Sequence, residues 1–296
     1  MIYIDPGSDK HIVESRLIES EYKDACQWIS DLGIEYKRTR FGNYEKDLDE
    51  FIKTGGKENA KESVQTFFNA HLEANELIRI KNAFDSFNST QALDTIKKAV
   101  TGQRFRNGSK SDQSRDFAFE LSMASRFLKA GYEVDLRTIT DIVVEINGKT
   151  LYVECKRIKS EKQLEKRVKE ANKQTKTRIT TSKSSSARSF IALNLTDVIN
   201  PNAMPMVETS LDSYTRISAE TLKNFVMLNK STLSKNQHNK CLGVFTEFTT
   251  QGFINKPDNY ALVNLREGNF YQYRLKKSDH DFLNKFYPKL GNQNIV

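Results

Sequence analysis

Two carboxylates and a lysine on a predicted β-hairpin are the residues of this chain best suited to chemistry. Residues 141–156 read DIVVEINGKTLYVECK. The dipeptide Asn147-Gly148 separates two apolar runs, which is a strong signal for a two-residue type I′ turn. With that turn, the ladder places Asp141 directly opposite Glu154. Because side chains alternate between the faces of a strand, Lys156 projects from the same face as Glu154.

The predicted register brings two like charges together. Directly opposed side chains lie about 5 Å apart, where two carboxylates destabilise the pairing. With an effective dielectric constant of about 20, the repulsion is about 3 kcal/mol. Either one pKa rises strongly or a cation binds between the oxygens. Lys156 on the same face favours the ionised acids, so a metal site is the preferred interpretation. A structural hairpin with a surface ion pair is the alternative.

The tripeptide Glu154-Cys155-Lys156 is informative only because of its β context. Glu-x-Lys also occurs at Glu21-Tyr22-Lys23, within a helical pattern. It occurs again at Glu35-Tyr36-Lys37, where no carboxylate hairpin lies upstream. The third occurrence alone combines a strand with an opposing acid.

A further carboxylate, Glu120, borders the apolar face of a helix predicted from Asp112 to Ala130. It lies close to Ala124 and Phe127 on that helix. A carboxylate at this border is partly buried and requires a partner. The alternative is a helix-edge glutamate that extends to water. Asp116, one turn earlier, is a weaker candidate for the same role.

Asp141 followed by Glu154-Cys155-Lys156 resembles the motif of the PD-(D/E)xK nuclease superfamily, which has the restriction-endonuclease-like fold. The resemblance covers residues 112–196, and Thr140 stands where the family has a proline. It implies that the chain has the family's α/β core and cleaves nucleic acid with a divalent metal. Hard oxygen ligands suit Mg²⁺ or Mn²⁺.

The resemblance also implies roles for individual residues. Asp141 and Glu154 would bind the metal together with the backbone carbonyl of Cys155. Lys156 would hold and polarise the attacking water or offset charge in the transition state. Many members carry a glutamate on the helix before the core sheet, and Glu120 matches that position. It would bind a second metal or order a metal-bound water.

Positive charge is concentrated immediately downstream of the hairpin. The chain has 296 residues and a net charge of +8. Residues 149–188 contain 13 Lys and Arg against 4 Asp and Glu, whereas the remainder contains 33 against 34. A basic segment next to paired acids predicts a polyanion as partner.

A predicted helix that starts with a capping box at Ser160–Gln163 carries much of this charge away from its apolar stripe. Such a face is often only solvated, and phosphate contact is the functional alternative. The predicted nucleic-acid contacts are Lys162, Lys166, Lys169, Lys173, Lys176, Arg178 and Lys183. Some exonuclease branches of the family place a glutamine where this chain has Gln174, followed four residues on by a tyrosine. Arg178 stands at that second position.

The elements that position these residues are predicted in the order α-β-β-β-α-β. They are the helix at 112–130, a strand at 132–136, the two hairpin strands, the basic helix and a strand at 190–195. The predicted class is therefore α/β, with a restriction-endonuclease-like core whose mixed sheet is flanked by helices.

Two regions surround this core. Residues 1–108 are predicted as a helical N-terminal region whose first helix starts near Ser8. Residues 109–296 are predicted as the nuclease domain with an α+β C-terminal extension. Within that extension, residues 260–274 are predicted to form a hairpin turning at Glu267-Gly268-Asn269.

Composition bounds the class of protein. A content of 38% hydrophobic and 28% charged residues is typical of globular proteins. No apolar run approaches about 18 residues, and the N-terminus lacks the pattern of a signal peptide. We therefore expect a cytoplasmic protein without a membrane partner. Cys26, Cys155 and Cys241 are too few and too scattered for a disulfide framework or a zinc site.

The sequence therefore predicts a metal-dependent nuclease of the restriction or phage-defence type. An endonuclease is favoured over an exonuclease, and DNA over RNA because most members of the superfamily cut DNA. The alternatives are an RNA-cleaving nuclease, a non-catalytic nucleic-acid-binding protein that retains the fold, and a scaffold whose basic helix binds an acidic protein. The oligomeric state stays open, including a homodimer.

Overall fold

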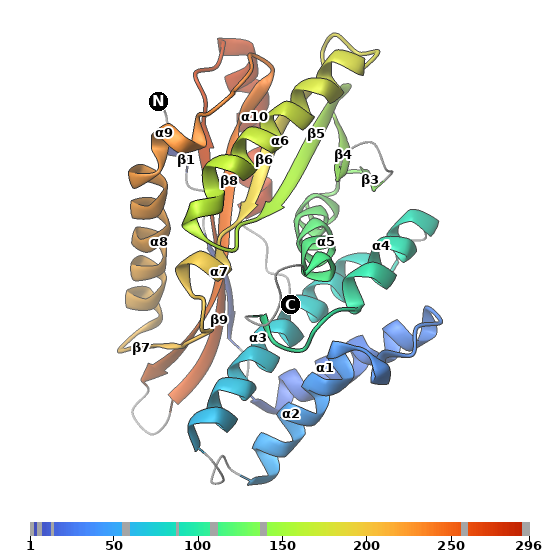
Figure 1. Cartoon of the computed structure of the whole chain (residues 1–296), viewed down its shortest axis with the longest axis vertical. Coiled ribbons are helices and arrows are strands. Elements are labelled where there is room, and N and C mark those ends of the chain that lie inside the picture. Colours follow the sequence, from blue (N-terminus) through green and yellow to red (C-terminus); the bar gives the residue numbers. More distant parts are fainter. Residues whose placement is uncertain are drawn as a thin grey trace.

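The computed structural model describes residues 3–4, 8–12, 15–54, 60–86, 89–106, 112–136, 141–255 and 260–291. The described strands form one mixed sheet in the order β1-β9-β8-β6-β5-β4-β3, with β2 also pairing with β9 and β7 with β8 (Figure 1). They are β1 (Tyr3–Ile4), β2 (Ser8–Ile12), β3 (Val134–Asp135), β4 (Ile142–Ile146), β5 (Lys149–Arg157), β6 (Arg188–Asn194), β7 (Met206–Glu208), β8 (Cys241–Asn255) and β9 (Tyr260–Gln272).

Helices cover both faces of this sheet. They are α1 (Ser15–Asp31), α2 (Arg40–Thr54), α3 (Ala60–Phe84), α4 (Thr90–Val100), α5 (Gln113–Lys129), α6 (Glu161–Thr181), α7 (Thr196–Ile199), α8 (Leu211–Leu228), α9 (Lys230–Leu233) and α10 (Lys277–Gly291), with a 3₁₀ turn η1 (Tyr36–Arg38). Apolar side chains of α1 to α5 and α10 pack into one core, and those of α6, α8 and α9 pack into another. Among the described helices, none is long and apolar enough to cross a membrane.

The central elements follow the predicted order. Helix α5, strands β3, β4 and β5, helix α6 and strand β6 reproduce the α-β-β-β-α-β sequence. Strands β5, β6 and β8 run parallel, whereas β3, β4 and β9 run antiparallel to their neighbours, so the sheet is mixed. The predicted α/β class with a mixed sheet flanked by helices is confirmed.

The N-terminal prediction is partly wrong. Residues Ser8–Ile12 form strand β2, antiparallel to β9, and the first helix starts only at Ser15. The boundary predicted near residue 108 lies outside the described residues. Strands from both sides of that position belong to the same sheet, and helices α1 to α4 share a core with β4 and β5.

The predicted C-terminal hairpin at 260–274 is also wrong, because β9 is one continuous strand antiparallel to β8. The residues taken for a turn are buried in mid-strand, where Gly268 pairs with Glu247. A Cβ on Gly268 would lie 2.8 Å from the ring of Phe245. The absence of a side chain at Gly268 thus leaves room for the Phe245 ring of the neighbouring strand, and the glycine does not form a turn.

Candidate active site

The hairpin of β4 and β5 has the predicted register. Ile142 pairs with Val153, and the ladder continues without a shift to the turn. Asn147 and Gly148 have φ angles of 50° and 72°. Two successive residues in the left-handed region are what a type I′ turn requires, and asparagine and glycine tolerate that region best. The turn therefore fixes which side chains share a face.

Asp141, Glu154 and Lys156 come together where β4 begins. Asp141 directly precedes β4, and its Oδ2 accepts a hydrogen bond from the backbone N–H of Cys155 at 2.6 Å. The Nζ of Lys156 lies 2.6 Å from Oε1 of Glu154, whose side chain is only 3% exposed. One acid is thus held by the backbone of β5, and the other by the lysine two residues along.

The pKa values of Asp141 and Glu120 are raised by burial first and by neighbouring negative charge second. Burial raises the pKa of Asp141 to about 6, and Glu154 adds to the rise. Burial, and then the charge of Asp141, raises the pKa of Glu120 to about 8. Lys156 opposes both shifts without cancelling them. Burial alone would lower the pKa of Lys156, but Glu154 and Asp141 raise it overall.

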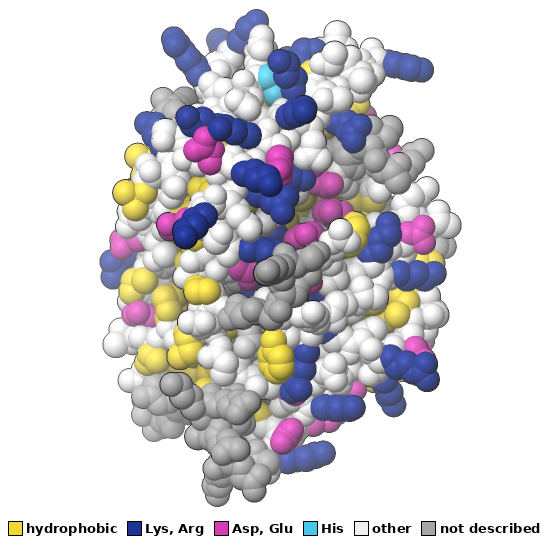
Figure 2. Space-filling view, viewed as in Figure 1, with side chains coloured by type: hydrophobic (Ala, Val, Ile, Leu, Met, Phe, Trp, Pro, Cys, Tyr) yellow, Lys and Arg dark blue, Asp and Glu magenta, His cyan; other side chains and the backbone are white. Residues whose placement is uncertain are grey.

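Two hollows reach the site through Lys156, and both are also lined by Arg167, whereas Asp141 and Glu154 line neither of the two. One has a volume of about 250 Å³ and is lined by Glu120, Asp116 and Cys155 among others, between α5 and β5. The other has a volume of about 450 Å³ and lies along α6. On this face of the molecule, acidic side chains gather between α5 and α6 with Lys and Arg around them (Figure 2). The site is therefore open to an anionic ligand beside the carboxylates.

Helix α6 starts after Ser160 as predicted, although the Ser160 side chain makes no capping hydrogen bond in the described part of the chain. Its basic residues do not all face the site. Lys173 and Arg178 line the 450 Å³ hollow together with Gln174. Lys166 and Lys169 form exposed ion pairs with glutamates one turn away. The remaining predicted contacts are exposed and do not line this hollow: Lys162, Lys176 and Lys183.

Sequence reasoning missed two arginines near the site. Arg167 lines both hollows. Its helical spacing from Gln174 and Arg178, seven and eleven residues on, is the signal that would have found it. Thr140, which stands where the nuclease motif has a proline, lies outside the described residues.

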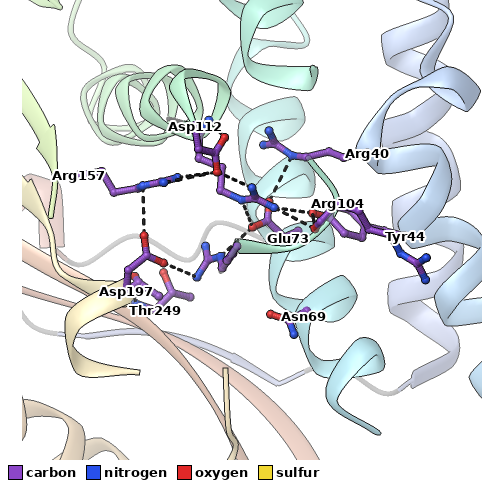
Figure 3. Close-up of polar contacts among 12 residues, drawn as sticks. Arg40, Tyr44, Asn69, Glu73, Arg104, Asp112, Arg157, Asp197 and Thr249 are labelled. Atoms are coloured by element: carbon purple, nitrogen blue, oxygen red, sulfur yellow. Dashed lines mark hydrogen bonds and ion pairs between the residues drawn. The ribbon is translucent and has the colours of Figure 1, made fainter. Parts of the chain in front are cut away.

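The second missed residue, Arg157, follows Lys156 at the end of β5. Its side chain is 4% exposed and lies 3.4 Å from Asp112 and 3.2 Å from Asp197 (Figure 3). It also lies 3.6 Å from Asp116. Asp112 is the N-cap residue of α5, the helix that carries Glu120. Arg157 therefore ties the strand that bears Glu154 to the helix that bears Glu120. Strand alternation was the available signal, because it places Arg157 on the buried face of β5, where a charge requires a partner.

Glu120→Gln tests the raised carboxyl pKa. The ordinary pKa of 4.5 in the unfolded chain rises to about 8 in the folded protein. The folded state therefore binds more protons between these two values, and its stability falls as the pH rises through them. In EDTA, we expect Glu120→Gln to be more stable than the parent above pH 8. The difference should vanish below pH 4.5, where the Glu120 carboxyl is protonated in both the folded and the unfolded chain.

Urea unfolding of both proteins across this pH range measures the effect. Glu145→Gln, at an exposed position of β4, is the control. It removes a carboxylate that is exposed instead of buried, so it separates the effect of burial from that of losing one negative charge. A stability difference for Glu120→Gln that is the same at every pH would contradict the raised pKa.

The donor atoms available for a metal are few. In the described ranges, no group of three or more His, Cys, Asp and Glu side chains is arranged to hold one ion. Asp141 and Glu154 remain as a pair, and proteins commonly bind Mg²⁺ through one or two carboxylates with water in the other positions. Comparisons of the chain with models of protein families, with curated proteins and with solved structures find no match.

Proposed function

We propose that this chain is a divalent-metal-dependent nuclease that hydrolyses phosphodiester bonds in DNA. The observation that carries the proposal is the juxtaposition of Asp141, Glu154 and Lys156 on one face of a register-fixed hairpin. These are the residue types of the PD-(D/E)xK motif, in the same strand context. The α-β-β-β-α-β order around them supports a restriction-endonuclease-like core. DNA is preferred over RNA by analogy with that superfamily.

The donor chemistry fits Mg²⁺ or Mn²⁺. Asp141 and Glu154 offer hard carboxylate oxygens from adjacent strands. The N–H and C=O of one strand residue point to the same side, so the carbonyl of Cys155 is directed toward Asp141 as its N–H is. A bound divalent ion would lower the pKa of a water molecule and neutralise charge on the phosphate. Glu120 would then order water at the edge of the site.

Lys156 is suited to stabilising charge. Its pKa is raised by Glu154 and Asp141 against the effect of burial, so the side chain stays an ammonium at neutral pH. An ammonium cannot accept a proton, which argues against a role as general base. It can donate to an attacking water and offset the charge that develops on the phosphate. We therefore assign Lys156 an electrostatic role.

One assay tests the proposal directly. Purified protein is incubated with circular plasmid, linear duplex, single-stranded DNA and RNA, each with Mg²⁺ or with EDTA. We expect cleavage of DNA with Mg²⁺ and none with EDTA, because the carboxylates alone supply no activated water. Cutting of the circular plasmid would identify an endonuclease.

Three results would contradict the proposal in different ways. Equal cleavage in EDTA would exclude a metal-dependent reaction. Cleavage of RNA alone would identify a ribonuclease. Binding without turnover under all conditions would identify a non-catalytic nucleic-acid-binding protein.

A further inference from the structure

A third hollow, of about 470 Å³, lies between α6 and the loop that joins α9 to β8. Its lining from α6 consists of three lysines, Lys169, Lys173 and Lys176, with Asn172 and one carboxylate, Glu170, and the loop adds Asn236 and Gln237. Lys173 also lines the 450 Å³ hollow beside the carboxylates. The two hollows therefore adjoin along one helix.

Helical geometry places the hollows on opposite flanks of α6. An α-helix turns by about 100° per residue. Arg167, Gln174 and Arg178 fall on one flank, and Lys169 and Lys176 on the other. Lys173 and Glu170 line both hollows and form the ridge between them. An elongated ligand in the first hollow can thus cross the ridge at Lys173 and enter the second.

Lysines outnumber carboxylates in the second hollow, between α6 and the loop, and its one carboxylate, Glu170, is paired with Arg167 at 3.1 Å. Neither Lys173 nor Lys176 has an ion-pair partner within the described ranges, whereas Lys169 pairs with Glu165. The pKa of the nearby His238 imidazole is affected by the same positive charge. Burial, and then the charges of Lys176 and Lys240, lower its pKa to about 4. A phosphate would therefore meet two ammonium groups that are not neutralised by carboxylates.

The loop beside these lysines is held in place by α6. Asn172 is fully buried, and its Nδ2 donates to the backbone carbonyl of Lys235 at 2.8 Å. Thr175 contacts the ring of His238 through a 3.1 Å hydrogen bond. The two residues between these anchors, Asn236 and Gln237, are both exposed. The groove is thus formed before any ligand binds, which reduces the entropy lost on binding.

We propose that this groove is a second nucleic-acid subsite, in which Lys173 and Lys176 bind backbone phosphates while Asn236 and Gln237 contact base edges. Lysine ammonium groups are typical phosphate contacts, and side-chain amides pair with the edge of adenine. A helix is about 10–12 Å across, and each nucleotide advances a B-DNA strand by about 3.4 Å. The subsite therefore takes nucleotides about three positions from the cleavage site. The inference rests on the proposed nuclease function for the identity of the strand.

The lysines are tested by the salt dependence of binding. Fluorescence anisotropy follows binding of single-stranded DNA of about 20 nucleotides, longer than a typical single-strand site. EDTA prevents cleavage during the measurement. Loss of one phosphate contact reduces the slope of log Kobs against log salt by about 0.7 for single strands. We expect Lys173→Ala/Lys176→Ala to reduce the slope by about 1.4.

The control Lys46→Ala/Lys97→Ala removes the same charge from exposed positions on α2 and α4. Its slope should equal that of the parent. The inference is overturned if the Lys173→Ala/Lys176→Ala slope also equals that of the parent. If the parent binds no nucleic acid at all, the proposed function fails as well, so the two failures are distinguishable.

The amides are tested with homopolymer strands of the four bases. We expect Asn236→Ala/Gln237→Ala to keep the parent's salt slope, since no charge changes. Its affinity for oligo(dA) should fall more than its affinity for oligo(dT), because the pair of hydrogen bonds to adenine is lost. An equal affinity for every base in both proteins would overturn the assignment of base contacts.

Discussion

Asp141→Asn is expected to reduce Mg²⁺-dependent cleavage by at least about a hundredfold, the cost of losing one preorganised electrostatic group in an active site. Asparagine retains an oxygen that can accept the N–H of Cys155, so the edge of the hairpin keeps its hydrogen bond. It removes the negative charge that a divalent ion needs. Initial rates on plasmid DNA with Mg²⁺ measure the loss.

Lys156→Ala is expected to reduce cleavage by at least about a hundredfold as well, and also to destabilise the fold. The lysine pairs with Glu154, whose side chain is 3% exposed. Removing one partner of a buried pair leaves an uncompensated charge and costs about 3–5 kcal/mol. Rates for this variant are therefore compared at a temperature where circular dichroism shows it folded.

DNA affinity in EDTA separates chemistry from binding. Asp141→Asn should bind DNA at least as tightly as the parent, because it removes a negative charge from the site. Glu145→Gln is the matched control, since it removes a carboxylate from the same face of β4 about 14 Å away along the strand. It should cleave like the parent. Full activity in Asp141→Asn would exclude the proposed metal site.

The hairpin could be predicted from the sequence because its information is local. Asn147 and Gly148 alone determine the turn, and the turn determines the register for both strands. Every pairing down to Ile142 and Val153 follows from those two residues. The order of elements around the hairpin was accessible for the same reason, since each element carries its own periodicity.

The errors arise where a residue's role depends on distant partners. Gly268 has the appearance of a turn glycine, and its role is visible only beside Phe245 of β8. Residues 8–12 lack the alternation of apolar and polar residues typical of a strand, yet they pair antiparallel with β9. Local signals cannot report such contacts, because the partner is supplied by tertiary structure.

The predicted phosphate contacts divide between two hollows, which the sequence alone could not show. They were chosen by charge and by distance from the apolar stripe, which does not distinguish the two flanks of α6. Lys173 and Arg178 lie beside the carboxylates, whereas Lys169 lines the groove at Asn236. Which flank of α6 lies next to the candidate site depends on how β5 is placed beside the helix. That placement is set by the sheet and not by the sequence of α6.

Glu73→Gln is expected to destabilise the fold strongly. The Oε1 of Glu73 lies 2.8 Å from Nε of both Arg106 and Arg115, and its Oε2 lies 3.5 Å from Nε of Arg40 (Figure 3). Its side chain is 1% exposed. Burial opposes ionisation, but the guanidinium groups of Arg115, Arg106 and Arg40 hold the pKa of Glu73 well below its usual range.

Glutamine at this position would keep the shape of the glutamate side chain. It would lose the negative charge that balances the guanidinium groups of Arg40, Arg106 and Arg115. We expect the free energy of unfolding to fall by about 3–5 kcal/mol, the cost of breaking a buried ion pair from one side. Urea unfolding at neutral pH measures it. Glu35→Gln is the control, because Glu35 pairs with Arg38 while 64% exposed and such pairs contribute about 0–1 kcal/mol. Equal losses in the two variants would show that burial does not matter at Glu73.

The same variant tests whether the N-terminal helices unfold with the rest of the chain. Glu73 belongs to α3 and contacts Arg115 of α5, which lies 2.5 Å from Asp112. Asp112 in turn contacts Arg157 at the end of β5, so one charge network runs from α3 to the strand of the candidate site. Helices α1 to α4 also share a core with β4 and β5. Glu73→Gln should therefore shift a single cooperative transition, and a separate early transition of the helices would contradict this coupling.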